Sequence, residues 1–318
     1  MQKNKEKKTL TEKTFRPIKV TQNFYQLGTS SFPAFLSLGE KGMIIEGGTG
    51  ATFKIIVNQI EELGIDPSRI KFIVLTHTHA DHIGAVPHLK SIWPHVKVLA
   101  SPVAAKILSK KEMYKGFLYI DQAISEIMKG KGDIAALPPA LQDYSFAVDQ
   151  VLEDGDTIDL GAGISWTVYH APGHSPCHIA LFEASEGTLD IGDTTGFYVP
   201  EKDVFWPNYF ESLEKYCDSI RKLSPLPAQR IVLSHNCVIE GGVKKHFEKA
   251  LKATEHYHQE LIRRVKAGED PEAIALEKAQ WVSSFTDIQP FEAILSLVKL
   301  LIKRSQQDAE KPNLFIFK

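Results

Sequence analysis

The chain has 318 residues, of which 43% are hydrophobic and 24% charged, the ordinary balance of a soluble globular protein with a large core. A formal net charge of −2 gives no support to a nucleic-acid partner, and no apolar run approaches the ~20 residues that span a membrane. Three cysteines without a Cys-x-x-Cys pair (Cys177, Cys217 and Cys237) do not make a disulfide scaffold and indicate a reducing, cytoplasmic location.

The N-terminal part of the chain changes character near residue 20. Residues 1–19 are rich in lysine and lack the apolar stretch of a signal peptide, so they are predicted to be a disordered basic tail. Residues 24–27, 33–38 and 43–45 are typical of strands separated by turns. Apolar residues at helical spacing predict a helix over about 51–63, which Gly64 ends.

The most informative segment follows the apolar strand expected at 70–76. It reads THTHADHIG (residues 76–84), and it holds the candidate metal ligands His77, His79, Asp81 and His82. Imidazole and carboxylate groups at this density suit zinc, iron or manganese. This segment therefore predicts a metal site at the end of a buried strand.

Three further candidate ligands occupy the same kind of position. Apolar runs at 164–169, 188–192 and 231–234 lead into His174, Asp193 and His235. Ligands at one end of neighbouring strands can converge on one edge of a sheet, where layered α/β folds place their sites. All seven residues are therefore predicted to form one centre.

The segments THTHADHIG, APGHSPCHIAL, LDIGDTTGF and IVLSHN occur in this order, and the chain resembles the metallo-β-lactamase superfamily over about residues 20–240. The resemblance implies an α/β fold, a four-layer αβ/βα sandwich with two mixed sheets face to face and helices outside. It also implies two metal ions. One would be held by His77, His79 and His174 and the other by Asp81, His82 and His235, with Asp193 bridging them.

The same resemblance leaves three features open. Glu46-Gly47-Gly48 stands where the family commonly has an Asp followed by Thr-Gly, and whether the longer Glu46 side chain supports a ligand is undecided. His178 matches a histidine of glyoxalase II-type relatives and is expected to support the site from outside. The less regular insertion at about 102–147 either covers the metal cleft, as in relatives, or adds a helix packed on the body.

Aromatic residues crowd the loop after Asp193, between Phe197 and Phe210. They are expected to wall the cleft against an apolar acyl or aryl part of a small-molecule substrate. Tyr198 is a candidate catalytic residue, because a tyrosine near this place contacts substrate in related lactonases. Residues 241–318 form a C-terminal helical region with helices at 243–266 and 290–304. The second helix has a wide apolar face that is expected to pack on the body or on a second subunit, as in a homodimer.

These features favour a metal-dependent hydrolase that uses a metal-bridging hydroxide on an ester, thioester or lactone. Two divalent ions are expected, with zinc favoured over iron or manganese, and Asp81 would orient the hydroxide and accept its proton. The alternative is an iron-dependent oxidoreductase on the same fold, of the sulfur dioxygenase or di-iron type. The di-iron type is disfavoured because His79 is retained and the C-terminal region reads as helices rather than a flavin domain. A binding protein without catalysis is disfavoured by the complete ligand set.

Overall fold

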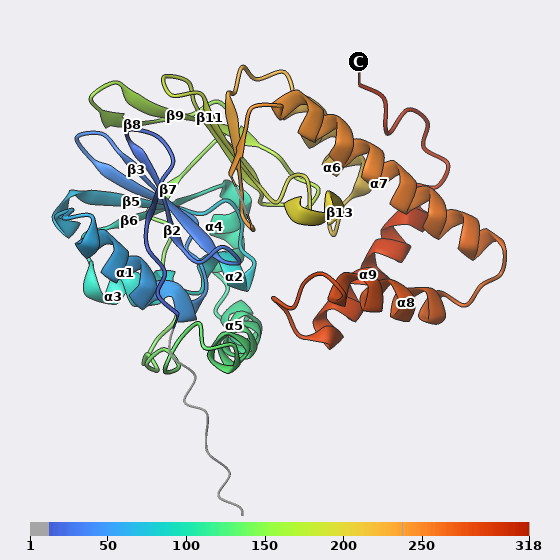
Figure 1. The fold of residues 1–318 in the computed structure, drawn as a ribbon, viewed down its shortest axis with the longest axis horizontal. Helices are drawn as coiled ribbons and strands as arrows, with labels where there is room; N and C mark the ends of the chain where they lie inside the picture. Colours follow the sequence, from blue (N-terminus) through green and yellow to red (C-terminus); the bar gives the residue numbers. More distant parts are fainter. Residues whose placement is uncertain (1–12, 237, 318) are drawn as a thin grey trace, which may run out of the picture.

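The computed structural model describes residues 13–236 and 238–317 and contains two mixed sheets flanked by helices (Figure 1). In the first sheet, β4 to β7 run parallel and β1 to β4 antiparallel. Its strands, in spatial order, are β1 (Ile18–Lys19), β2 (Phe24–Gly28), β3 (Pro33–Leu38), β4 (Gly42–Ile45), β5 (Ile70–Val74), β6 (Lys97–Ala100) and β7 (Gln150–Val151).

The second sheet is antiparallel except for the parallel pair of β11 and β14. Its spatial order is β15 (Val238–Glu240), β14 (Arg230–Leu233), β11 (Thr188–Gly192), β10 (Ile179–Glu183), β9 (Ile164–His170) and β8 (Thr157–Gly161). Strands β12 (Phe197–Val199) and β13 (Val204–Trp206) form a separate antiparallel pair.

Helices cover the outer faces of the two sheets. The first half of the chain supplies α1 (Phe53–Glu62), α2 (Ala80–Ile83), α3 (Val86–Ile92), α4 (Pro102–Leu108) and α5 (Met113–Gly130). The second half supplies α6 (Leu213–Leu223), α7 (Val243–Lys266), α8 (Pro271–Ser283) and α9 (Phe291–Gln307). Within the described residues, no helix is both long and apolar enough to cross a membrane.

Three separate apolar cores follow from this layering. Ile44 and Ile73 of the first sheet pack against Ile56 of α1, because alternate strand residues point to opposite faces. Their neighbours on the other face, such as Met43 and Val74, form the core between the sheets. The outer face of the second sheet shares its core with α6 and α7, and α8 and α9 pack in turn on α7. The four-layer αβ/βα sandwich with C-terminal helices is therefore confirmed.

The structure corrects the expected N-terminal boundary. Residues 1–12 of the predicted tail lie outside the described residues. The prediction fails for residues 13–19, because Ile18 and Lys19 pair with β2 and the backbone N–H of Lys13 donates to Gly132 at 3.0 Å. Backbone pairing of this kind fixes a polar segment that composition alone describes as disordered.

The insertion and the C-terminal region are largely helical. Residues 102–147 contain α4 and α5, and α5 carries its buried residues at helical spacing. Helix α7 spans the predicted 243–266, and α9 spans the predicted 290–304 except for Pro290. The apolar face of α9 is covered within the same chain by α7 and α8, and a homodimer stays a prediction.

Candidate metal centre

The seven candidate ligands lie at one end of both sheets. The chain leaves β5 at Val74, and the short helix α2 begins directly after His79, so Asp81 and His82 fall in its first turn. Strands β9, β11 and β14 of the second sheet lead into His174, Asp193 and His235. The site therefore lies between two sheets, not on one edge of a single sheet as the strand pattern suggested. Stacking the sheets face to face brings their loops together.

Within this centre, the side chains form two groups of three donors. His79 Nδ1 lies 3.0 Å from His77 Nε2 and 3.0 Å from His174 Nε2. In the other group, Asp81 Oδ2 lies 3.5 Å from both His82 Nε2 and His235 Nε2. Three donor atoms within a few ångströms of one another match the ligand number of a tetrahedral site with one open position.

Asp193 stands between the two groups. Its Oδ2 atom is 3.4 Å from His174 Nε2 and 3.7 Å from His77 Nε2 in the first group. The same atom is 3.3 Å from His82 Nε2 and 3.9 Å from His235 Nε2 in the second. One carboxylate oxygen thus faces ring nitrogens of both groups, which is the position a bridging ligand requires.

Hydrogen bonds on the outer side of the rings set which nitrogen faces inward. His174 Nδ1 donates to the backbone oxygen of Asn208 at 3.0 Å, and His235 Nδ1 donates to that of Ser31 at 2.6 Å. Because a carbonyl oxygen only accepts, Nδ1 carries the proton in both rings. The lone pair of Nε2 is therefore left to point into the centre, as outer partners of metal-binding histidines ensure.

Glu46 performs this orienting role for His82. Its Oε2 atom lies 2.8 Å from His82 Nδ1, while Oε1 accepts from Thr76 Oγ1 at 2.5 Å and from Ser234 Oγ at 2.8 Å. Glu46 also adopts a left-handed backbone with φ of 71°, which is uncommon for a residue with a side chain. The longer Glu46 side chain thus reaches the His82 ring, which answers the question that the sequence left open. These bonds tie both carboxylate oxygens to His82, Thr76 and Ser234, so Glu46 is placed to orient the His82 ring, although it also stands near His77 and His82 in a third possible donor group.

His178 acts on the backbone of the bridging residue. Its Nε2 atom accepts from the backbone N–H of Asp193 at 3.0 Å. The preceding Gly192 has a positive φ of 51°, and a Cβ atom there would lie 2.5 Å from His178 Nε2. The glycine and the histidine together fix the turn that presents Asp193, in line with the supporting role expected for His178.

The electrostatics of the centre fit bound cations. His82 Nε2 is buried and makes no well-aligned hydrogen bond, although carboxylate oxygens of Asp193 and Asp81 lie 3.3 and 3.5 Å away, and the donors are imidazole nitrogens and carboxylate oxygens. Burial lowers the pKa of His77 and His174 well below the ordinary value, so these rings are neutral and able to bind metal. Burial acts to raise the pKa of Asp193, but His235 and His174 hold it well below the usual range. The residues present thus fit two divalent ions.

A cavity of about 280 Å³ opens directly onto the ligands. Its walls are mainly apolar and come from segments distant in sequence. They include Phe117 and Ile120 of α5, Phe197, Trp206 and Phe210 of the aromatic loop, and Ile288, Ala293 and Leu297 at and before α9. The insertion therefore contributes to the cleft, and the C-terminal contribution was not predicted.

Tyr198 is the predicted site residue that the structure does not bring to the centre. Its hydroxyl donates to Asp203 Oδ1 at 2.9 Å, and its ring packs on Phe205 and against His246. Phe197, its neighbour on β12, lines the metal-facing cavity in its place. Adjacent residues of a strand point to opposite faces, so the two aromatic side chains separate.

Comparison with known proteins places these features in a family context. The model of the family described as Metallo-beta-lactamase superfamily matches residues 32–235. Among solved structures, a metallo-β-lactamase from Cronobacter sakazakii with a HARLDQ motif aligns with a TM-score of 0.57 at 19% identity. That alignment covers 76% of this chain and 97% of that one, and at this identity it shows the fold alone.

Three curated relatives extend the comparison. A Beta-lactamase-like protein 2 homolog from Caenorhabditis elegans is 25% identical over 296 residues, covering 92% of this chain and 83% of that protein. The Probable metallo-hydrolase YflN from Bacillus subtilis is 27% identical over 214 residues, covering 63% and 76%. The Flavo-diiron protein FprA2 from Clostridium acetobutylicum is 35% identical over 198 residues, covering 60% of this chain but only 42% of that protein.

Proposed function

The chain belongs to the metallo-β-lactamase superfamily, and from this premise we propose that it is a dinuclear metal-dependent hydrolase of an ester, thioester or lactone. The observation that carries the proposal is the position of Asp193 Oδ2, within 3.3 to 3.9 Å of ring nitrogens from both donor groups. A single ion would need only one of these groups, whereas a shared carboxylate serves two. Zinc suits this donor set best, and iron or manganese would also be accepted.

Two divalent ions held here would lower the pKa of a water molecule and polarise a substrate carbonyl. The protein's own groups then orient the reactants. Asp81 lines the cavity beside His82 and His235, and its carboxylate takes the proton released by the attacking water. The hydrogen bond to Glu46 fixes the orientation of the His82 ring. The backbone N–H of Asp193 donates to His178, which holds Asp193 between the two donor groups.

The walls of the cavity suggest the class of substrate. Phe117, Phe197 and Phe210 offer aromatic surface close to the ligands, and Leu297 adds aliphatic surface to the same lining. Such walls favour an apolar acyl or aryl group and exclude water from the reacting carbonyl. A substrate with a short polar acyl group would leave this surface uncovered.

Metal analysis combined with a substrate panel tests the proposal. We expect protein purified without chelator and reloaded with zinc to hold two equivalents per chain, because each donor group supplies three ligands. The loaded protein should hydrolyse members of a panel of aryl esters, thioesters and lactones, and chelation should abolish that activity. One equivalent at saturation, or no hydrolysis of any panel member by the two-metal protein, would count against the proposal.

The similarity to the flavo-diiron protein supports a second candidate, an iron-dependent oxidoreductase on the same donor set. The chain spans less than half of that relative's length, so the similarity extends only to part of it. Protein loaded with iron under anaerobic conditions should then be tested for oxygen consumption with a persulfide and with a reduced flavin. Oxygen uptake without hydrolysis by the zinc form would favour this second candidate.

A further inference from the structure

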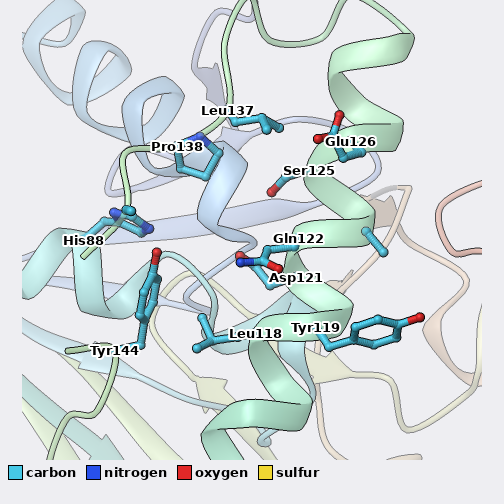
Figure 2. A pocket seen from close by; sticks show the side chains of 12 residues that line it. His88, Leu118, Tyr119, Asp121, Gln122, Ser125, Glu126, Leu137, Pro138 and Tyr144 are labelled. Atoms are coloured by element: carbon cyan, nitrogen blue, oxygen red, sulfur yellow. The ribbon is translucent and has the colours of Figure 1, made fainter. Parts of the chain in front are cut away.

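A second cavity, of about 380 Å³, is lined by other residues of α5 than those that line the metal-facing cavity (Figure 2). It is lined by α5, by His88 of α3 and by the segment from Leu137 to Tyr144. None of the residues that line it is a candidate metal ligand, and the described donor groups that could hold a metal ion all lie in the centre described above. A ligand of this cavity would therefore differ from the metal ions expected at the centre.

Two buried polar atoms beside this cavity lack partners. His88 is 1% exposed and Ser125 is 2% exposed, and neither His88 Nε2 nor Ser125 Oγ has a hydrogen-bond partner. The His88 ring is held between Phe53, which stacks on it at 4.7 Å, and the edge-on ring of Tyr144. Figure 2 shows the side chains of His88 and Ser125 facing the same space. Buried polar groups are costly without a partner, so this pair points to a ligand.

Asp121 adds a negative charge to the same space. One carboxylate oxygen, Oδ1, accepts from the backbone N–H of Gly50 at 2.7 Å, which fixes the side chain. A Cβ atom at Gly50 would lie 2.5 Å from the other oxygen, so the glycine makes room for it. Glu126 is a second carboxylate at the wall, and no lysine or arginine is among the described residues that line the cavity. The cavity therefore repels anions and attracts a cation.

We propose that this cavity is a binding site for a small organic cation, a primary ammonium group on a short apolar chain. A primary ammonium group has three N–H donors and no acceptor. Asp121 would pair with its charge, Ser125 Oγ and His88 Nε2 are the unpartnered atoms of the same lining, and Leu118 and Leu137 would receive the apolar chain. The proposal is independent of the reaction at the metal centre.

The charge states of the lining residues agree with this assignment. Burial lowers the pKa of His88, so its ring is neutral and can accept a hydrogen bond. Burial also raises the pKa of Asp121 to about 6, and the negative charge of Asp81 adds to the rise. An ammonium group would stabilise the ionised form of Asp121.

Titration of the metal-loaded full-length protein with n-butylamine, followed by amide NMR, tests the site. At pH 7.5 we expect saturable shifts confined to α3, α5 and residues 137–144, with affinity at least tenfold higher than for 1-butanol and no binding of butyrate. Asp121→Asn should lower the amine affinity at least tenfold. Glu112→Gln makes the same charge change next to α5 but outside the cavity, and should leave the affinity unchanged.

A second variant keeps the test decisive if Asp121→Asn does not fold. Leu137 is 38% exposed, so Leu137→Lys is compatible with folding and would place a competing ammonium group at the cavity. It should weaken butylamine binding at least tenfold. Equal binding of butylamine and butanol, unchanged affinity in both variants, absence of saturable shifts, or shifts confined to the metal-facing cavity would each overturn the proposal.

Discussion

Asp193 connects the two donor groups of the metal centre, because one of its oxygens faces histidines from both. Replacing it with alanine removes the shared ligand and the negative charge that offsets repulsion between two cations. We therefore expect Asp193→Ala to lose both metal ions, whereas a single histidine variant loses mainly the ion of its own group. Metal content after dialysis, measured for each variant, checks this expectation.

A buried carboxylate on β11, the strand that leads into Asp193, provides the matched control. Asp190 is 1% exposed, accepts from the backbone N–H of Gly192 at 3.0 Å, and belongs to neither donor group. Burial raises its pKa well above the usual value, which favours the protonated form, and asparagine is a close mimic of that form. Asp190→Asn should keep both ions. Retention of both ions by Asp193→Ala would show that the bridge assignment is wrong.

Asp121 gives a pH dependence of stability whose sign follows from its burial. Its pKa rises from 3.8 to about 6 in the folded protein, so the folded state holds this proton more tightly than the unfolded state does. The contribution to stability is full below pH 3.8 and is lost as pH rises through about 6. Between pH 4.5 and 7.5, the metal-free protein should lose about 2 kcal/mol relative to Asp121→Asn. Urea unfolding at both pH values measures this difference, and a parallel pH dependence in the two proteins would refute it.

At the scale of whole elements, α5 and α9 each contribute a wall to the metal-facing cavity. Each buried methylene contributes about 0.8 kcal/mol, so kcat/KM for ester or lactone substrates should rise up to about fourfold per methylene until the cavity is filled. Phe117→Ala and Leu297→Ala should each flatten this trend by removing one wall. A homologous series of acyl substrates from acetyl to octanoyl provides the measurement.

Tyr119→Ala is the control for these wall variants. Tyr119 also lies on α5, but it is 77% exposed and does not line the metal-facing cavity. Its replacement should leave the chain-length trend intact. Equal rates for acetyl and octanoyl substrates in the unmodified protein would rule out the proposed apolar wall.

How much could be predicted from the sequence differs among the elements. Local signals sufficed where an apolar run ends in a ligand, as at His77 or His235, because strand and ligand are neighbours in the chain. They failed for Tyr198. Side chains along a strand point alternately to its two faces, but the sequence does not show whether Phe197 or Tyr198 of β12 faces the metal centre. Helix α8 was not predicted, because two of its buried residues, Ala275 and Ala279, are small and give a weak apolar pattern.

The cavity walls depend on contacts between distant parts of the chain. Leu297 lines the metal-facing cavity because α9 packs beside α7. No pattern of residue spacing in the sequence predicts that packing. The wide apolar face of its helix predicted packing, but not which partner it would find. The metal ligands could therefore be predicted from the sequence, whereas the walls of the substrate cavity depend on tertiary contacts that the sequence pattern does not reveal.

For the whole molecule, the C-terminal helices are part of the main fold. Phe247 of α7 and Ile294 of α9 belong to the same buried core as Ile191 and Leu233 of the second sheet. That sheet is joined to the first by the core between them, in which Trp166 Nε1 donates to Ser37 Oγ at 2.9 Å. Continuous packing of this kind favours unfolding as one cooperative unit.

We therefore expect a single unfolding transition for the metal-loaded protein. Trp281 of α8 reports on the C-terminal helices, whereas Trp166 reports on the core between the sheets. Tryptophan fluorescence of Trp281→Phe and Trp166→Phe, each lacking one reporter, should give transitions that coincide with the loss of helical circular dichroism. Helices α8 and α9 pack on α7, and α7 shares a buried core with the second sheet, so detaching the helices would expose apolar residues of that core. An earlier transition seen only when Trp281 is present would instead identify the C-terminal region as a separately unfolding unit.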